Sequence, residues 1–274
     1  MGRIPIRMER EQGMATQRGV LVTGTGGRIG AAIAREFAAL GDHVVLSDVD
    51  AGRMEQTAKS ISDAGGTATT IVADMSNEDD VKRLAAEAIE AAGQIEVLVN
   101  CAGIFPNCPV IEMETEEWNR VWNVNLNGPF FLTRAIGRHM VDNGIHGSIV
   151  NISSGAGSSA RTGGSHYCGS KAAINMFTKV LAIELGPYGI RVNAVAPGLV
   201  LDNVMSLPAP DYTHEYVATL LKGIPLGRTG EPEDIAHMVV FVSSDKASWV
   251  SGEVFGVNGA SQAGRTHLPP SRRA

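Results

Sequence analysis

The chain has 274 residues and carries 23 Lys and Arg against 29 Asp and Glu, which gives a formal net charge of −6. Its 44% hydrophobic and 19% charged residues are typical of a folded globular chain and exclude wholesale disorder. The acidic balance excludes a general nucleic-acid-binding surface, and no apolar run approaches the roughly 18 residues of a membrane span.

Cysteine usage and the two ends of the chain bear on its compartment. Three cysteines without a C-x-x-C pair exclude a disulfide framework, and without an H-E-x-x-H sequence no metal site is expected. Residues 1–17 are polar and lack the apolar core of a signal peptide, so they are expected to form an N-terminal extension. Residues 264–274 are expected to be a C-terminal tail. We therefore expect a cytoplasmic protein.

Between these ends, short β-branched runs alternate with helix-length segments. The first helical segment shows the pattern, since Ile33, Phe37 and Leu40 recur on one stripe and Gly41 ends it. Such alternation predicts an α/β fold, in which residues 18–263 form one doubly wound, Rossmann-type domain. Its seven-stranded sheet would be mostly parallel, with helices on both faces. The runs are GVLVTG (19–24), HVVLSD (43–48), TIVAD (70–74), EVLVN (96–100), SIVNIS (148–153), RVNAVAP (191–197) and EVFGVNG (253–259).

The first run leads through a glycine-rich turn, TGTGGRIG at residues 23–30, into a helix. Such a turn directs backbone N–H groups and the positive end of a helix dipole at one point, which suits a pyrophosphate, although tight turns need glycine in any case. Asp48 ends the second run, where a carboxylate accepts from the ribose hydroxyls of a dinucleotide and repels a 2′-phosphate. We expect NAD rather than NADP, with capping of the helix that opens at Ala51 as the alternative role of Asp48.

Polar residues also close the third and fourth runs. Asp74 ends the third, and the sequence NCAG at residues 100–103 ends the fourth. Because parallel strands end at one edge of the sheet, these residues are placed to line adenine and ribose. Simple capping of the strand ends is the alternative.

Ser153 and Ser154 close the fifth run, and Tyr167 and Lys171 follow four residues apart, on one face of the next helix. A phenol titrates near ~10, too high for a general base at neutral pH, and a nearby ammonium lowers that pKa. A serine hydroxyl can hold the substrate oxygen while the proton moves. The alternative is an ordinary exposed Tyr/Lys pair on a helix.

A long connection follows the sixth run and precedes a helix that starts near Pro232. Connections of this length at the carboxyl edge of a sheet are typical of binding lids, so residues 199–225 are expected to set specificity. Tyr212, His214 and Glu215 lie within this lid, but their spacing assigns them no role.

Taken together, these motifs resemble the short-chain dehydrogenase/reductase family, in its single-domain branch. The resemblance covers residues 18–260, and every motif stands in the family's order and spacing. The matching motifs are TGTGGRIG (23–30), Asp48, Asp74, NCAG (100–103), VNLNG (124–128), NISS (151–154), YCGSK (167–171) and APG (196–198).

The resemblance implies a role for each matching residue. Tyr167 would be the general acid/base, Lys171 would lower its pKa and bind the nicotinamide ribose, and Ser154 would orient the substrate oxygen. Asn125 would hold a water that links Lys171 to solvent, with a local hydrogen bond as the alternative. The implied cofactor-binding residues are Gly24, Gly26, Arg28, Ile29, Gly30, Asp48, Asp74, Met75, Asn100, Ala102, Gly103, Tyr167, Lys171, Pro197, Gly198 and Val200.

Two positions depart from the family pattern. Arg28 stands where the family usually has glycine, and Asp202 stands where it commonly has threonine. A cation at a helix N-terminus is unfavourable unless an anion lies beside it. Arg28 is therefore expected to contact the cofactor pyrophosphate or an anionic substrate group, with an exposed side chain as the alternative. His166 and the three cysteines are interpreted as structural.

The function implied is NAD(H)-dependent interconversion of a secondary alcohol, such as a polyol or sugar, with its carbonyl. One alternative is an NADP(H)-dependent reductase of 3-oxoacyl thioesters, and another is an NAD-binding sensor without turnover. The resemblance also implies a homotetramer built from the helical segments 115–142 and 165–186. Ile174, Phe177 and Leu181 are consistent with that interface, although core packing explains them equally well. Neither a nucleic acid nor a membrane is expected as a partner.

Overall fold

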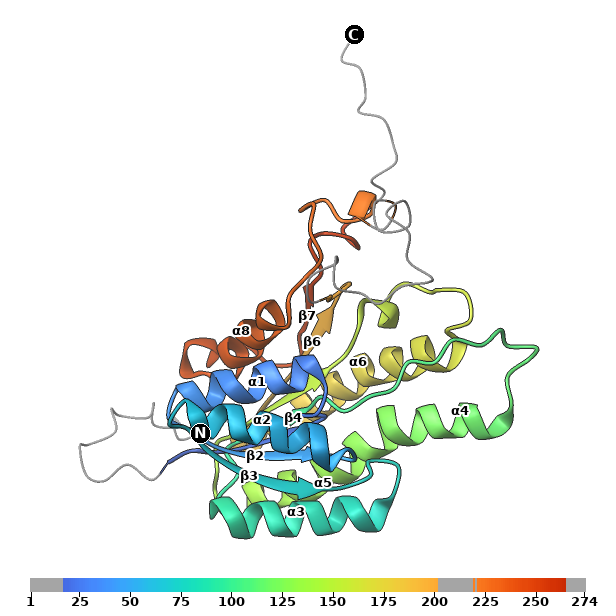
Figure 1. The fold of residues 1–274 in the computed structure, drawn as a ribbon. Helices are drawn as coiled ribbons and strands as arrows, with labels where there is room; N and C mark the ends of the chain where they lie inside the picture. Colours follow the sequence, from blue (N-terminus) through green and yellow to red (C-terminus); the bar gives the residue numbers. More distant parts are fainter. Residues whose placement is uncertain (1–16, 202–218, 220, 265–274) are drawn as a thin grey trace.

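The computed structural model describes residues 17–201, 219 and 221–264 (Figure 1). Asp202, Tyr212, His214 and Glu215 lie outside the described residues, as do most of the two expected terminal extensions. The strands are β1 (Gly19–Thr23), β2 (His43–Asp48), β3 (Thr67–Val72), β4 (Val97–Asn100), β5 (Ser148–Ile152), β6 (Arg191–Pro197) and β7 (Val254–Val257). The helices of eight residues or more are α1 (Arg28–Ala39), α2 (Ala51–Asp63), α3 (Glu78–Ala92), α4 (Thr115–Trp122), α5 (Gly128–Asp142), α6 (Ser165–Leu185) and α8 (Pro232–Ser243).

The strands form one seven-stranded sheet in the order β3-β2-β1-β4-β5-β6-β7. Every neighbouring pair is parallel. The chain therefore moves outward from β1 to β3, returns to the middle, and moves outward again to β7. This topology confirms the predicted doubly wound fold, and its strand order reverses between β1 and β4, the place where such sheets bind ligands.

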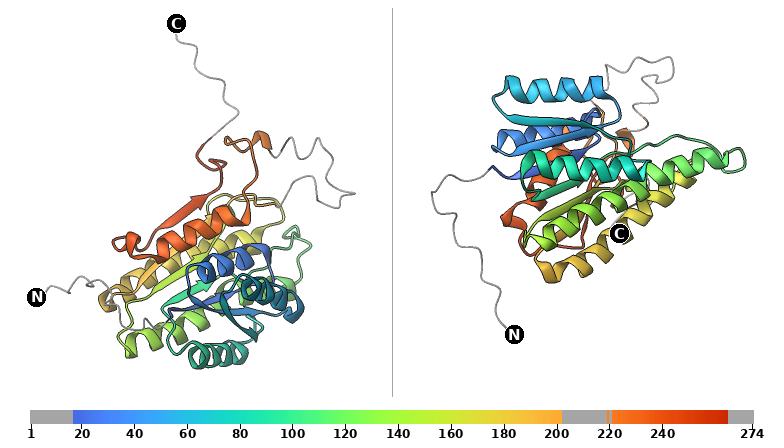
Figure 2. Two further views of the ribbon diagram at one scale, coloured as in Figure 1. Left: turned by 60° about the vertical axis from the view of Figure 1, so that its left-hand side comes forward. Right: turned by 90° about the horizontal axis from the view of Figure 1, so that it is seen from below.

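Helices cover both faces of the sheet (Figures 1 and 2). Successive residues of β1 show why, since Val20 and Val22 pack with α1, α2 and α8, while Leu21 packs with α3, α5 and α6. A strand buried on both faces needs apolar side chains at consecutive positions, which accounts for the unbroken run that the sequence shows there.

The boundaries differ from the prediction in three places. Leu40 is the C-cap of α1 and is 61% exposed, so it does not belong to the buried stripe that Ile33 and Phe37 form. Strand β3 ends at Val72, before Asp74, because Val72 pairs with Asp48, the last residue of its partner strand β2. The Asp74 N–H donates to the carboxylate of Asp80 at 3.1 Å. The expected helical segment 115–142 is interrupted by a π-helical turn, Asn123–Asn127, between α4 and α5.

Candidate active site

The carboxyl ends of β1, β4 and β5 meet the start of α6 at one edge of the sheet. The Thr23 hydroxyl at the end of β1 accepts from the backbone N–H groups of Cys101 and Ala102, at 3.0 and 3.1 Å. A Cβ on Gly24 would lie 2.8 Å from the Ala102 backbone, and its φ of +74° also favours glycine. The two strand ends therefore touch, with no room for a side chain between them.

The glycine-rich turn ends in an uncapped helix start. Gly27 is the N-cap of α1 without a side-chain hydrogen bond, and the first turn contains no acidic residue. Two backbone bonds to the Ser47 carbonyl, from Gly24 at 2.7 Å and Thr25 at 3.2 Å, fix the turn against β2. A helix N-terminus of this kind attracts an anion.

Gly30 lies where α1 passes closest to this turn, and a Cβ there would overlap the carbonyl oxygen of Gly24. We expect Gly30→Ala to lower the free energy of unfolding by about 2–3 kcal/mol, because a backbone atom cannot give way as a flexible side chain can. Gly186→Ala is the matched control, since no atom lies within 4 Å of its Cβ position. Urea denaturation of both variants checks the prediction, and equal stability would contradict the close approach.

The Asp48 carboxylate lies at the end of β2 beside the turn. It accepts from the Gly26 N–H at 2.8 Å and from the Asp50 N–H at 2.9 Å. The helix cap that the sequence left open for Asp48 is made by Asp50, whose side chain accepts from Arg53 N. Asp48 thus orders the glycine-rich turn, and as an acceptor it retains capacity for further donors.

Arg28 is the first residue of α1, and its side chain is exposed. Its Nη2 lies 3.5 Å from the carbonyl oxygen of Val200, just beyond β6. Pro197 ends β6, and the Gly198 N–H donates to Val257 O at 2.9 Å. The cation that departs from the family pattern therefore bridges the glycine-rich turn and the segment after β6.

Asp74 and Asn100 take part in local structure. The Asp74 carboxylate accepts from both the N–H and the hydroxyl of Ser76 at 2.8 Å, as strand-end capping would have it. Asn100 is 3% exposed and donates to Asn151 Oδ1 at 2.8 Å and Thr133 Oγ1 at 3.1 Å. Its Oδ1 is buried without a partner among the described residues. The Met75 side chain is buried against Gly128.

Ser154, Tyr167 and Lys171 come together beside this edge. The Ser154 side chain makes a hydrogen bond with Tyr167. Lys171 is buried, donates from Nζ to the Ile152 carbonyl at 2.8 Å, and places Nζ 6.0 Å from the centroid of the Tyr167 ring. The arrangement joins a phenol, a hydroxyl and an ammonium that the sequence places on two elements.

Asn125 lies in the π-helical turn and is buried. Its carboxamide accepts from the Ile104 N–H and donates to the Ile104 carbonyl, both at 2.9 Å, and it also donates to Ser170 Oγ at 3.2 Å. A Cβ on Gly103 would lie 3.3 Å from Asn125 Oδ1 and 3.5 Å from Lys171 Nζ. Gly103 therefore leaves a space that the amide and the ammonium both border.

Burial dominates the titration of this group. It raises the pKa of the Tyr167 phenol above its ordinary value, against the Ser154 hydrogen bond and the charge of Arg161, which lower it. Burial lowers the pKa of Lys171 to about 8. The lowering of the Tyr167 pKa by Lys171 stays a prediction; Lys171 Nζ is bonded to the Ile152 carbonyl and lies 6.0 Å from the ring centroid.

Two residues beside Tyr167 were missed by the sequence analysis. The guanidinium carbon of Arg161 lies 4.8 Å from the centroid of the Tyr167 ring. The Phe105 ring makes an edge contact with the same phenol at 6.2 Å between centroids. Neither residue belongs to a motif, and the only signal in the sequence is their place in the loops after β4 and before α6.

His166 and Cys101 have the structural roles that the sequence indicated. His166 is buried, accepts from the Tyr167 N–H at Nδ1, and contacts Glu117 through Nε2 at 3.2 Å. Burial raises the pKa of the Cys101 thiol to about 12, which makes it unreactive. Cys108 and Cys168 are free thiols as well.

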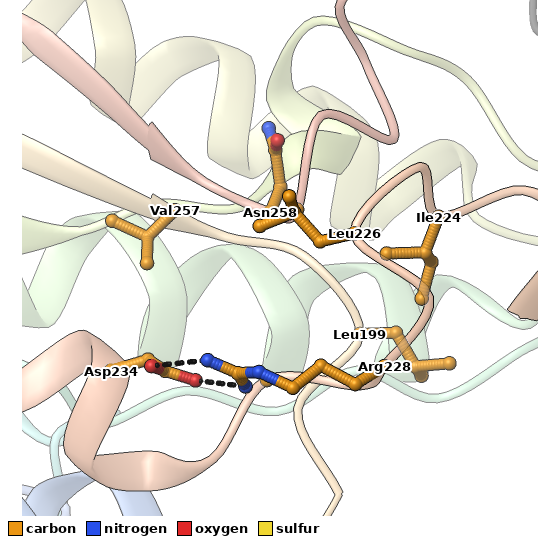
Figure 3. A pocket seen from close by; sticks show the side chains of 9 residues that line it. Leu199, Ile224, Leu226, Arg228, Asp234, Val257 and Asn258 are labelled. Atoms are coloured by element: carbon orange, nitrogen blue, oxygen red, sulfur yellow. Dashed lines mark hydrogen bonds and ion pairs between the residues drawn. The ribbon is translucent and has the colours of Figure 1, made fainter.

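A pocket lies beyond the ends of β6 and β7 (Figure 3). On one side Arg228 pairs with both carboxylate oxygens of Asp234, at 2.6 and 2.9 Å, and this contact holds the pKa of Asp234 down at about 2. Leu199, Ile224 and Leu226 supply apolar walls. The ion pair links Arg228, in the segment that follows the expected lid, to Asp234 in the first turn of α8.

Within the described ranges, no group of three or more His, Cys, Asp or Glu side chains is arranged to hold a metal ion. No helix in those ranges has the length and hydropathy to cross a bilayer.

Comparisons with known proteins extend over most of the chain. A family profile described as enoyl-(acyl carrier protein) reductase matches residues 25–260. The 3-oxoacyl-(acyl-carrier-protein) reductase of Thermotoga maritima is 36% identical over 239 residues, which are 87% of this chain and 95% of that protein. The L-rhamnose 1-dehydrogenase (NAD(P)(+)) of Azotobacter vinelandii is 40% identical over 247 residues, 88% of this chain and 94% of that protein.

A solved structure is similar over nearly the same span. It is a protein from Beutenbergia cavernae that is described as a provisionally assigned NAD(P)-dependent gluconate 5-dehydrogenase, and it contains NADP at low occupancy. The match has a TM-score of 0.83 and 37% identity, and it covers 90% of this chain and 97% of that one.

Proposed function

The chain belongs to the short-chain dehydrogenase/reductase family, and from that premise we propose that it interconverts a secondary alcohol and its carbonyl with NAD(H). The observation that carries the proposal is the grouping of Ser154, Tyr167 and Lys171, with Lys171 beside Gly103 at the edge of the sheet where the glycine-rich turn also lies. A proton donor or acceptor, a hydroxyl and an ammonium at the open edge of a doubly wound sheet suit this reaction.

The residues present fit a nicotinamide dinucleotide. The uncapped start of α1 suits its pyrophosphate, and the space that Gly103 leaves beside Lys171 Nζ suits its ribose. Arg28, which bridges toward Val200, would add a cation at the pyrophosphate. When bound, the nicotinamide supplies or accepts the hydride, which is chemistry that no side chain here provides. The remaining proposed contacts are those of Gly24, Gly26, Ile29, Gly30, Asp74, Met75, Asn100, Ala102, Pro197, Gly198 and Val200.

The side chains are proposed to hold the substrate oxygen and move its proton. Ser154 orients the oxygen, and the Tyr167 phenol gives the proton in reduction and takes it in oxidation. Lys171, held by Ile152, supplies positive charge beneath the phenol. Asn125 holds the backbone of Ile104 beside Lys171, and the proposed water that links Lys171 to solvent would lie along this amide.

Asp48 supports NAD as the cofactor. Its carboxylate lies beside Gly26, where it would accept from the ribose hydroxyls and oppose a 2′-phosphate. The similar solved structure contains NADP, and the similar rhamnose dehydrogenase is named for NAD(P)(+). The choice between NAD and NADP is therefore the part of the proposal that an experiment should test first.

A polyol, a sugar or another secondary alcohol is the proposed substrate. The second candidate is NADP(H)-dependent reduction of a 3-oxoacyl thioester, which the name of the Thermotoga relative favours. A sensor that binds NAD without turnover is opposed by the presence of Ser154, Tyr167 and Lys171 together. Two assays separate these candidates. Secondary alcohols, polyols and sugars are tested for oxidation, and 3-oxoacyl thioesters are tested for reduction. We expect turnover of an alcohol; turnover of thioesters alone would favour the second candidate, and none at all with NADH bound would favour the sensor.

We further propose a homotetramer formed through α5 and α6. Of the three residues that the sequence analysis named for this interface, Ile174 and Leu181 are buried and Phe177 is half-buried against the core. A different stripe of α6 is exposed, with Met176 at 61% and Ile183 at 77%. Exposed apolar side chains in a row on one helix are typical of a subunit interface.

Replacing Ile183 with Glu should dissociate the assembly. In a symmetric interface each subunit would bury one unpaired carboxylate at the contact, and burying unpaired charges is costly. Sedimentation velocity at micromolar concentration measures the result. Leu40→Glu is the matched control, since Leu40 is similarly exposed but lies at the C-cap of α1, away from α5 and α6. A wild-type protein that sediments as a stable monomer would contradict the proposal.

A further inference from the structure

We propose that Arg161 is a specificity-determining residue that binds an anionic oxygen group of the substrate, a carboxylate or a phosphate, next to Tyr167. The inference rests on the proposed function and goes beyond it by narrowing the substrate to hydroxy acids or phosphorylated alcohols. It follows from where the Arg161 guanidinium lies, what holds it there, and which of its donors remain available.

The guanidinium lies against the phenol that is proposed to move the substrate proton. Its central carbon is 4.8 Å from the centroid of the Tyr167 ring, closer than Lys171 Nζ at 6.0 Å. Phe105, 69% exposed, meets the same ring edge-on and supplies an apolar wall. A substrate oxygen at the Tyr167 hydroxyl would therefore have a cation and an apolar surface as neighbours.

The loop before α6 is shaped to place this side chain. A Cβ on Gly164 would lie 2.8 Å from Arg161 Cγ, so glycine leaves the space in which the arginine lies. The Gly164 N–H donates to the Arg161 carbonyl at 3.2 Å, which closes the turn. The Cys108 N–H donates to the Gly163 carbonyl at 2.9 Å and ties this loop to the one that carries Phe105. Backbone contacts therefore fix the segment from which the guanidinium extends.

Most donors of Arg161 have no hydrogen-bond partner among the residues that the structure describes. Arg134 and Arg228 each pair with a carboxylate, at 2.8 and 2.6 Å. Arg161, by contrast, has no ion pair with any residue that the structure describes, and it makes one long hydrogen bond, 3.4 Å, to the Phe105 carbonyl. Stacking occupies only the face of a guanidinium, so its in-plane N–H groups remain free to bind an oxyanion.

The position of Arg161 determines how far the anionic group of the substrate lies from its reacting oxygen. An oxyanion held by a guanidinium that stacks on Tyr167 lies only a few atoms from the oxygen that Tyr167 serves. The substrate would then carry its hydroxyl or keto group near its anionic end, as in a sugar acid or a sugar phosphate. A neutral polyol would bind without this contact.

The test compares substrates that differ only in charge. Wild-type enzyme with NAD is assayed on a polyol, the sugar acid of the same chain length and the corresponding sugar phosphate. Arg161→Gln, Arg161→Lys and the control Lys59→Gln follow. Lys59 is a suitable control because its side chain is 74% exposed on α2, outside the proposed subunit interface, and its removal changes the net charge equally. Calorimetric titration of each compound into the enzyme with NADH gives binding without turnover.

We expect Arg161→Gln to lower kcat/KM for the anionic substrate relative to the neutral one by about tenfold, mainly through KM, with Arg161→Lys in between and Lys59→Gln unchanged. Preference for the acid or for the phosphate identifies the anion. An equal loss on charged and neutral substrates would assign Arg161 to Tyr167 alone and overturn the inference. Turnover of polyols with no discrimination overturns it while the proposed function stands. If no compound is turned over, the proposed function fails. The calorimetric titration then decides the inference separately: if Arg161→Gln binds the anionic compound as tightly as the wild type does, the inference is overturned as well.

Discussion

Tyr167→Phe should lower kcat by about 10²- to 10⁴-fold while the dissociation constant of NADH stays near the wild-type value. The variant keeps the ring that Arg161 and Phe105 contact and removes only the hydroxyl that bonds with Ser154. Stopped turnover with intact cofactor binding is therefore the signature of a lost proton donor rather than of a lost fold. Steady-state kinetics and NADH fluorescence titration give the two readouts.

The matched control is Tyr188→Phe, at a tyrosine that is 52% exposed in the short 3₁₀ turn Gly186–Tyr188 after α6. It should leave kcat unchanged. Turnover retained in Tyr167→Phe would remove Tyr167 from the catalytic role.

The pH profile offers a second check on Tyr167. Burial raises its pKa, while Ser154 and Arg161 lower it and Cys168 raises it. A phenol whose pKa is raised keeps its proton at neutral pH, so carbonyl reduction should be favoured there and alcohol oxidation should increase as the pH rises. Lys171, with a pKa of about 8, loses its charge over the same range. The profiles of kcat/KM in both directions should therefore slope in opposite senses.

Asp48→Asn should raise kcat/KM for NADP relative to NAD by about 10- to 100-fold, because it removes the charge that opposes a 2′-phosphate. The substitution preserves the size of the side chain and one acceptor for the Gly26 or Asp50 N–H. Asp50→Asn is a close control, since it removes a carboxylate two residues away that caps α2. An unchanged ratio in Asp48→Asn, or an equal change in both variants, would contradict the role given to Asp48.

The sheet could be predicted from sequence because its strands are buried on both faces. Val20, Leu21 and Val22 all lie in the core, so the run stands out without any periodicity. Gly41, with φ at +86°, ended α1 as expected. The end of β3 could not be predicted from its own residues, because it depends on where the partner strand β2 ends, at the pair of Val72 with Asp48.

The site was predictable where motifs carry it and not where packing does. Ser154, Tyr167 and Lys171 follow from spacing and resemblance. The π-helical turn around Asn125 leaves no trace in a pattern of 3.6 residues per turn, and the position of Arg161 depends on Gly164 and on Tyr167 across the loop. The sequence left Ile174, Phe177 and Leu181 open between subunit interface and core, because apolar residues occupy more than one face of α6 and the sequence alone does not tell which face is buried.

The measurement that tests the account most directly is nicotinamide absorbance during alcohol oxidation by the wild-type enzyme, with NAD and NADP run in parallel on the best substrate of the panel. Turnover should be faster with NAD than with NADP at subsaturating cofactor, because the Asp48 carboxylate lies beside the glycine-rich turn. Turnover with NADP alone would contradict that assignment and favour the thioester reductase in its place.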